Sequence, residues 1–258
     1  MARTSPRVSR LWSLSGIALL LLLWEAGHRA YGPLVLPGLD DTAVALWRML
    51  REGAVGPELA RTAGHAGLGW VAGALAGIAA GTLAGLRQDA QRALQPVAVV
   101  LLGIPAIAWV VLAILWFGGY WAVVFTVAVA TGPLVFAAAV SGVQSLDGGL
   151  IRMARVFRVP LAVRIVHMHV PNMLVHVFPA LAATLAMSWK VAVMAELLAG
   201  AGGIGDGLAT ARAHVDTAAM MAWVMVVVGV LIVVDLALIQ PLQRRAFPWR
   251  DDGRGAAP

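Results

Sequence analysis

Few side chains of this sequence could do chemistry, and one type is missing altogether. There is no cysteine, which excludes disulfides, thiolate metal sites and a cysteine nucleophile. Lys190, the only lysine, stands between Trp189 and Val191. An ATP-binding P-loop needs its lysine within G-x-x-x-x-G-K-[ST], because backbone amides and that lysine surround the phosphates. The sequence therefore lacks such an ATP site. Since no carboxylates or histidines have catalytic spacing either, we expect a non-catalytic chain with no cofactor of its own.

Two further patterns resemble cofactor sites but lack the context that such sites need. Gly200, Gly202 and Gly205 satisfy G-x-G-x-x-G, yet a dinucleotide site also needs a preceding strand in a βαβ unit. These glycines follow an apolar run, so we predict a tight turn. A bis-histidine haem needs histidines deep in facing membrane helices. The six histidines instead fall near the ends of apolar runs, with His167, His169 and His176 at one level and His28, His65 and His214 at the other.

Lys190, Trp189 and Glu196 lie within one apolar run, residues 173–199. Ionisable side chains are costly in lipid and usually face protein or a water-filled cavity. Two interpretations of Lys190 stay open: it attracts an anionic solute along a translocation pathway, or it pairs with a carboxylate of the protein. Glu196 is an imperfect partner, because residues six apart do not share a helix face. We take the three as candidate pathway residues.

The composition indicates which elements position these residues. Of 258 residues, 60% are hydrophobic and 12% charged, and the mean hydropathy is +0.84. Soluble domains carry about 25% charged residues. A membrane-spanning helix needs about 20 apolar residues. Such runs lie near 11–31, 64–86, 93–116, 120–143, 173–199 and 218–240, so we predict an all-α integral membrane protein with about six transmembrane helices.

The first and second runs each carry a distinctive pattern. Arginines before residue 11 give the first run the form of a signal peptide, but Glu25, His28 and Arg29 follow instead of a cleavage site, so we predict a retained helix. In the second run glycines recur every fourth residue, which places them on one helix face. That face favours close helix packing, with a pore-lining role as the alternative. The glycines are Gly69, Gly73, Gly77, Gly81 and Gly85.

The distribution of arginine predicts the orientation, since basic residues are enriched in cytoplasmic segments. With the N-terminus inside, 13 arginines fall in cytoplasmic segments and 5 outside. We therefore expect cytoplasmic tails at 1–10 and 244–258, a transmembrane domain at 11–243 and a long inner loop at 144–172. Surface arginines at a membrane account for the formal charge of +6 without nucleic-acid binding. In the polar segment 32–63, Leu46, Met49 and Leu50 predict a short amphipathic helix on the outer face.

The inner loop carries an amphipathic pattern from Asp147 to Pro171. Its apolar face holds Leu150, Met153, Ala154 and Phe157, and its basic face holds Arg152, Arg155 and Arg158. Such a helix either rests on lipid headgroups or inserts its apolar side chains into a groove of a cytoplasmic partner. The pattern alone does not decide between these two possibilities.

This loop resembles that of binding-protein-dependent ABC importer permeases, whose pattern is E-A-A, three residues, G, nine residues, I-x-L-P. The E-A-A positions fall on Arg152, Met153 and Ala154, the glycine on Arg158 and the proline on Pro171. The spacing matches throughout, while Arg152 and Arg158 depart from the usual glutamate and glycine. Three further segments resemble the nitrate, sulfonate and taurine branch of this family: VLPGLDDTAVALWRML, GIPAIAWVVLAILWFG and WKVAVMAELLAGAGGIGDGLATA.

The resemblance implies a type I ABC importer permease in a bacterial inner membrane, with both termini cytoplasmic. Two permeases, usually identical, would form the pathway for a small anion such as a sulfonate, taurine or nitrate. Two cytoplasmic ATPase subunits would bind the ATP, and an extracytoplasmic solute-binding protein would deliver the substrate. The loop helix would be the coupling helix to the ATPase. The alternative is a gradient-driven secondary carrier or channel, which has no use for the spaced loop ending at Pro171.

Overall fold

The computed structural model describes residues 6–239 and 241, and every regular element among them is a helix. The helices leading to the inner loop are α1 (Pro6–Tyr31), α2 (Leu39–Arg51), α3 (Val55–Leu86), α4 (Gln88–Gly103), α5 (Ala106–Trp116) and α6 (Gly119–Gln144). The loop itself holds α7 (Gly148–Val156), α8 (Leu161–Arg164) and the π-helix η1 (Ile165–His169). After it come α9 (Val170–Ala199), α10 (Ile204–Ala213), α11 (Thr217–Val234) and the π-helix η2 (Asp235–Ile239).

The all-α membrane architecture predicted from the sequence is confirmed. The number of unbroken helices long enough to cross a membrane differs from the predicted six. Four helices of the described chain are long and apolar enough to cross a membrane, at Val55–Leu86, Gly119–Gln144, Val166–Ala199 and Thr217–Ala237. The predicted span 93–116 is instead a pair of helices, α4 and α5, bent by 99°. The first predicted run lies inside α1, a helix of 26 residues.

The break between α4 and α5 has a local cause. Pro105 has no amide hydrogen to donate, and its ring disfavours the helical conformation in the residue before it. Ile104 accordingly takes an extended conformation, with φ −79° and ψ 125°. Pro133 and Pro179, in contrast, lie within α6 and α9, which continue through them. Only the first of these three prolines therefore separates two helices.

The glycine stripe of α3 packs closely against α6. A Cβ at Gly73 would lie 2.7 Å from Ala128 O, and one at Gly77 would lie 2.5 Å from Gly132 O. Gly69, Gly81 and Gly85 face Val124, Phe136 and Val143 of α6 in the same way. The stripe is therefore a packing seam, because only glycine leaves room for a neighbouring backbone at this distance.

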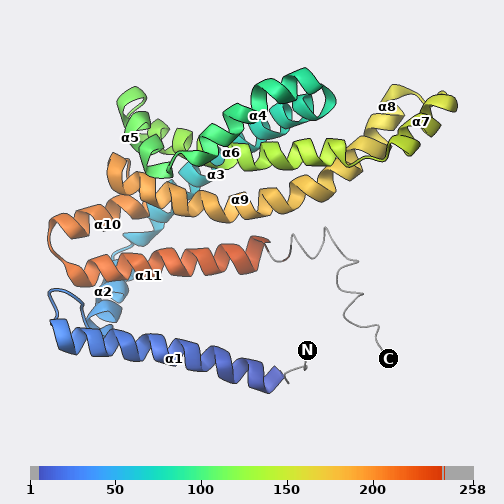
Figure 1. The fold of residues 1–258 in the computed structure, drawn as a ribbon. Coiled ribbons are helices and arrows are strands. Elements are labelled where there is room, and N and C mark those ends of the chain that lie inside the picture. The colour runs from blue at the N-terminus through green and yellow to red at the C-terminus, as the bar shows by residue number, and fades with distance from the viewer. Residues whose placement is uncertain (1–5, 240, 242–258) are drawn as a thin grey trace.

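The long helices α6 and α9 lie side by side and carry the inner loop at one end (Figure 1). The end of α11 and the beginning of α1 point toward that same end of the molecule (Figure 1). The opposite end holds α2, α10 and the turns around them. There Met49 of α2 packs with Ile204 and Trp223, so an amphipathic helix does form within 32–63, while its place on the outer face stays a prediction.

Candidate functional site

The helix α7 presents most of its apolar side chains to the surroundings. Met153 is 53% exposed and Phe157, just beyond the helix, 74%, whereas Ala154 is buried. Leu150 and Arg152 are also exposed, while the side chains of Ile151 and Arg155 lie outside the described residues. Asp147 Oδ1 accepts a hydrogen bond from Gly149 N at 2.8 Å and so holds the first turn. Apolar residues exposed at the tip of a helical hairpin are typical of a docking surface.

Arg158 ends this helix in a left-handed conformation, with φ 49°. Val159 N donates to Ala154 O at 2.9 Å across the turn, as in a helix C-cap where glycine is the usual residue. Arg158 occupies the glycine position of the pattern found in the sequence. The structure thus supplies the physical reason for that glycine, and shows that the turn forms here with arginine in its place.

The base of the loop is fixed to both flanking helices. Asn172 Nδ2 donates to Gly142 O and to Ser145 Oγ, both at 2.8 Å. A Cβ at Gly142 would lie 2.9 Å from Met173 Cα, so the end of α6 and the start of α9 touch directly. Pro171, the last residue of the loop pattern, is exposed in the first turn of α9, where its missing amide hydrogen costs nothing. The loop therefore joins two helices held together at its root.

The three candidate pathway residues of α9 lie in different surroundings. Lys190 is exposed and lines a cleft of about 390 Å³ between α9 and the α11–η2 segment, together with Asp235 and Leu231. Trp189 is half-buried and packs between two core clusters. Glu196 is completely buried and contacts other residues than Lys190. The structure thus keeps Lys190 and Trp189 at neighbouring positions and places Glu196 apart from them.

Glu196 forms a buried polar junction with Thr62 and His65 of α3. Its Oε1 lies 2.7 Å from His65 Nδ1, and its Oε2 accepts from Thr62 Oγ1 at 2.9 Å. All three residues are 0% exposed. His65 Nδ1 and Glu196 Oε1 therefore share one buried hydrogen bond. We call these three residues the Glu196 junction; it connects α3 to α9.

Two side chains of the junction, together with Glu58 of α3, hold the beginning of α10. Gly203 N donates to Glu58 Oε2 at 2.5 Å, Ile204 N to Thr62 Oγ1 at 2.9 Å, and Gly205 N to Glu196 Oε2 at 3.0 Å. These amides have no partner within their own helix, so side chains must supply one. A Cβ at Gly205 would contact Val193 O. The glycines singled out as a tight turn form one: Gly200 and Gly202 have positive φ, and Gly205 lies directly against the backbone of α9 at Val193.

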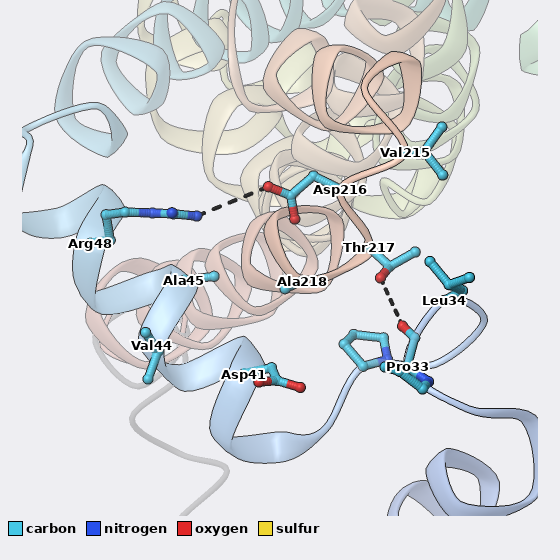
Figure 2. Close-up of a pocket in the computed structure, with 11 residues that line it drawn as sticks. Pro33, Leu34, Asp41, Val44, Ala45, Arg48, Val215, Asp216, Thr217 and Ala218 are labelled. Atoms are coloured by element: carbon cyan, nitrogen blue, oxygen red, sulfur yellow. Dashed lines mark hydrogen bonds and ion pairs between the residues drawn. The ribbon is translucent and has the colours of Figure 1, made fainter.

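A second cleft lies at the end of the molecule opposite the inner loop. It measures about 380 Å³ and is lined by α2, by the segment after α1 and by the turn before α11. Figure 2 shows Arg48 facing Asp216 across it, at 4.0 Å, and Thr217 Oγ1 donating to Pro33 O at 3.0 Å. Asp216 Oδ1 also caps α11 through Ala219 N. This end therefore offers charged and polar groups beside exposed apolar residues such as Val44 and Val215.

Sequence reasoning missed the residues that act through long-range contacts. Thr62 and His65 are more than 130 positions from Glu196, so no local pattern could connect them. Asn172 follows the predicted Pro171 directly, and its amide side chain was a signal for a helix-end hydrogen bond.

Comparisons with known proteins identify the family. The model of the binding-protein-dependent transport system inner membrane component matches residues 73–247. A Bacillus subtilis protein named as an aliphatic sulfonates transport permease is 25% identical over 260 residues, covering 98% of this chain and 94% of the relative. The Escherichia coli taurine transport system permease protein is 26% identical over 248 residues, 93% of this chain and 90% of the relative.

A solved structure shows the same fold. The inward-facing MetNI methionine ABC transporter matches with a TM-score of 0.60 at 16% identity, over 71% of this chain and 92% of the chain compared. The loop resemblance and the helical architecture agree with these matches. The chain therefore belongs to the multi-pass inner-membrane permeases of binding-protein-dependent ABC importers, in the branch that includes the sulfonate and taurine permeases.

Proposed function

We propose that this chain forms the translocation pathway of a small anion and transmits the work of a separate ATPase through α7. The observation that carries the proposal is the exposed apolar surface of α7, held at the tip of two long membrane helices. Two ATPase subunits would each receive one such helix from a pair of identical permeases. This chain would itself bind no ATP and catalyse no reaction.

The exposed side chains favour a protein groove over a lipid surface for α7. Met153 and Phe157 project from the hairpin tip, and the root of the loop is fixed by Asn172. A helix that rests on lipid headgroups needs no fixed attachment to the membrane helices. A helix that transmits movement must not bend where it joins the helices it moves. When ATP closes the ATPase dimer, the two coupling helices would approach each other, and the permeases would rock between inward and outward states.

The cleft beside Lys190 is the proposed site of anion attraction. Sulfonates and taurine, named for two relatives, share an acidic sulfonate group. The Lys190 ammonium is exposed in a cleft with otherwise mainly apolar lining, and an ammonium inside a membrane protein usually marks a path for ions or a counter-ion site. Trp189 packs in the same cluster as Ala186, a residue of the cleft lining. Buried Glu196 would shape the pathway by holding helices in place.

The orientation proposed from arginine counting places both termini and the α7 end in the cytoplasm. The cleft around Arg48 and Asp216 would then face outward, where a solute-binding protein docks. Because the chain has no cysteine, single cysteines at Phe157 and Val215 can report the two faces in intact cells. A membrane-impermeant maleimide should label Val215→Cys alone; labelling of Phe157→Cys from outside would reverse the orientation.

The coupling role is tested with the complete complex in proteoliposomes. Phe157→Asp should abolish substrate-stimulated ATP hydrolysis, because it places a charge in the apolar contact. Phe157→Leu is the matched control, because leucine keeps an apolar side chain at this exposed position and should retain the stimulation. Full stimulation in Phe157→Asp would refute the docking surface, and uptake that needs no ATP would indicate a secondary carrier.

A further inference from the structure

The cleft beside Lys190 contains a second ionisable side chain, Asp235. Lys190 lies on the wall formed by α9, and Asp235 lies on the facing wall of α11 and η2, one helical turn beyond Leu231. Both charged residues are exposed. The rest of the lining is apolar and includes Val228 and Ile232. The cleft therefore offers one positive and one negative group on opposite walls, with apolar side chains around them.

A buried apolar cluster holds the two walls together. Val234 of α11 packs there with Ala182 of α9, and Trp189 packs against them. Val234 and Trp189 each directly precede a charged residue of the cleft. Successive residues of a helix point about 100° apart, so the cluster fixes the backbone from which both charged side chains project. The positions of the two charged residues are therefore set by helix packing.

The two charged side chains lean toward one another along the helices. The end of α9 and the start of α11 lie at the end of the molecule opposite the inner loop (Figure 1). Lys190 lies about 14 Å before the end of α9, and Asp235 lies about 27 Å beyond the start of α11, at 1.5 Å per residue. Side chains tilt toward the N-terminus of their helix. Lys190 therefore tilts toward the loop end and Asp235 away from it, into the part of the cleft between them.

Asp235 also has the local structure of a functional residue. It lies inside the apolar span Thr217–Ala237 and is the first residue of the π-helix η2. Short π-helical turns are rare and are frequently found at functional sites. A carboxylate within a membrane span is costly and usually faces protein or a water-filled pathway. The acid therefore belongs with Lys190 in any account of what the cleft binds.

The two charges together favour one class of solute. A solute that carries only an acidic group is attracted by Lys190 and repelled by Asp235. A solute that carries an acidic group and an ammonium on a short carbon chain pairs with both residues, and its carbon chain contacts the apolar walls. The solutes named for two relatives, aliphatic sulfonates and taurine, differ in this respect, because taurine is a sulfonate that also carries an ammonium.

We propose that this cleft binds a small zwitterion, with Lys190 on its acidic group and Asp235 on its ammonium. The inference rests on the proposed function, because it names the solute class of the same site. It makes Asp235 the residue that distinguishes an amino-sulfonate from a simple sulfonate. The volume of the cleft, about 390 Å³, lies in the usual range of small-molecule sites, about 300 to 1,000 Å³.

A cysteine-protection experiment measures this binding without ATP and without a solute-binding protein. Because the chain has no cysteine, Val228→Cys places its single thiol in the cleft lining. The complex with its ATPase is labelled with a maleimide in nanodiscs, and the labelling rate of the permease is followed against solute concentration. Taurine carries both groups, ethanesulfonate only the acidic group and ethylamine only the ammonium. Taurine should halve the labelling rate at a concentration about tenfold lower than either of the others, the size of one charged hydrogen bond.

Variants in the same Val228→Cys background assign the two charges. Asp235→Asn should make taurine and ethanesulfonate equally effective, and Asp235→Glu should restore the advantage of taurine. Lys190→Met should weaken protection by both sulfonates. Asp89→Asn is the matched control, because Asp89 is a 98% exposed carboxylate in the first turn of α4, outside the cleft, and it should leave every protection curve unchanged.

Equal protection by taurine and ethanesulfonate with Asp235 in place would reduce the cleft to an anion site and overturn the zwitterion. A thiol that the maleimide does not reach, or that none of the three solutes protects, would also overturn it. The comparison of solutes on Val228→Cys alone decides the question even where Asp235→Asn does not assemble. The proposed function fails separately, if the complete complex with its binding protein shows no ATP-dependent uptake of any small anion or zwitterion.

Discussion

The packing seam between α3 and α6 makes a quantitative prediction, because two glycines of the same helix differ only in what faces them. A Cβ at Gly77 would lie 2.5 Å from Gly132 O and 3.0 Å from Val135 Cβ, whereas a Cβ at Gly67 meets nothing within 4 Å. Alanine at either position stabilises a helix by about 0.8 to 1 kcal/mol relative to glycine. Both variants gain this helix propensity. The difference between their free energies of unfolding therefore measures the cost of the close contact at Gly77 alone.

Overpacking a tight contact costs about 1 to 3 kcal/mol, and the atom met at Gly77 is a backbone oxygen that no side-chain rotation removes. Gly77→Ala should therefore be less stable than Gly67→Ala by about 1 to 3 kcal/mol. In a chain of this size that is roughly 2 to 12 °C in Tm. Thermal unfolding of both variants in the same detergent measures the difference. Equal melting temperatures, or a higher one for Gly77→Ala, would refute the close approach of the two helices.

Three further predictions concern the loop and the cleft. Arg158→Gly should raise the free energy of unfolding by up to about 1 kcal/mol, because glycine adopts the left-handed backbone conformation of this position without the strain of a Cβ. Arg158→Val should lower the free energy of unfolding in the same thermal assay. Asn172→Ala loses two hydrogen bonds at the loop root and about 1 to 3 kcal/mol of local stability, so trypsin should cleave within 144–172 faster than in wild type. Lys190→Met should raise the KM for an anionic substrate about 10- to 100-fold, the size of a lost charged hydrogen bond, while Lys190→Arg keeps the positive charge and should raise it less. An unchanged KM in Lys190→Met would leave the lysine with a role inside the protein.

The sequence predicted the features that depend on local pattern. Long apolar runs in a membrane favour helices, because a helix satisfies all its backbone hydrogen bonds within one segment. The four-residue glycine spacing predicted a packing face because that spacing is set by helix geometry alone. The position of α7 and the turn at Gly200 followed from amphipathic spacing and from glycine conformational freedom. Each of these signals lies within a few turns of the chain.

The features that the sequence could not predict depend on the tertiary arrangement. Pro105 and Pro179 are both prolines in apolar runs, yet only Pro105 separates two helices, bent by 99°. Lys190 and Glu196 are near in sequence, which makes them a candidate pair. Glu196 in fact binds a histidine 131 positions away, and helix packing alone brings the two together.

The glycine seam explains why such distant hydrogen bonds are needed. A stripe that repeats every four residues looks nearly the same after α3 slides by one turn along α6, so close packing alone specifies the register weakly. The polar contacts do not repeat. Glu196 binds α3 only at Thr62 and His65, and Asn172 binds α6 only at Gly142 and Ser145. Because α9 carries both Glu196 and Asn172, it fixes α3 and α6 at opposite ends and so sets the register of the seam. A permease built this way can rock as a block without its helices slipping past one another.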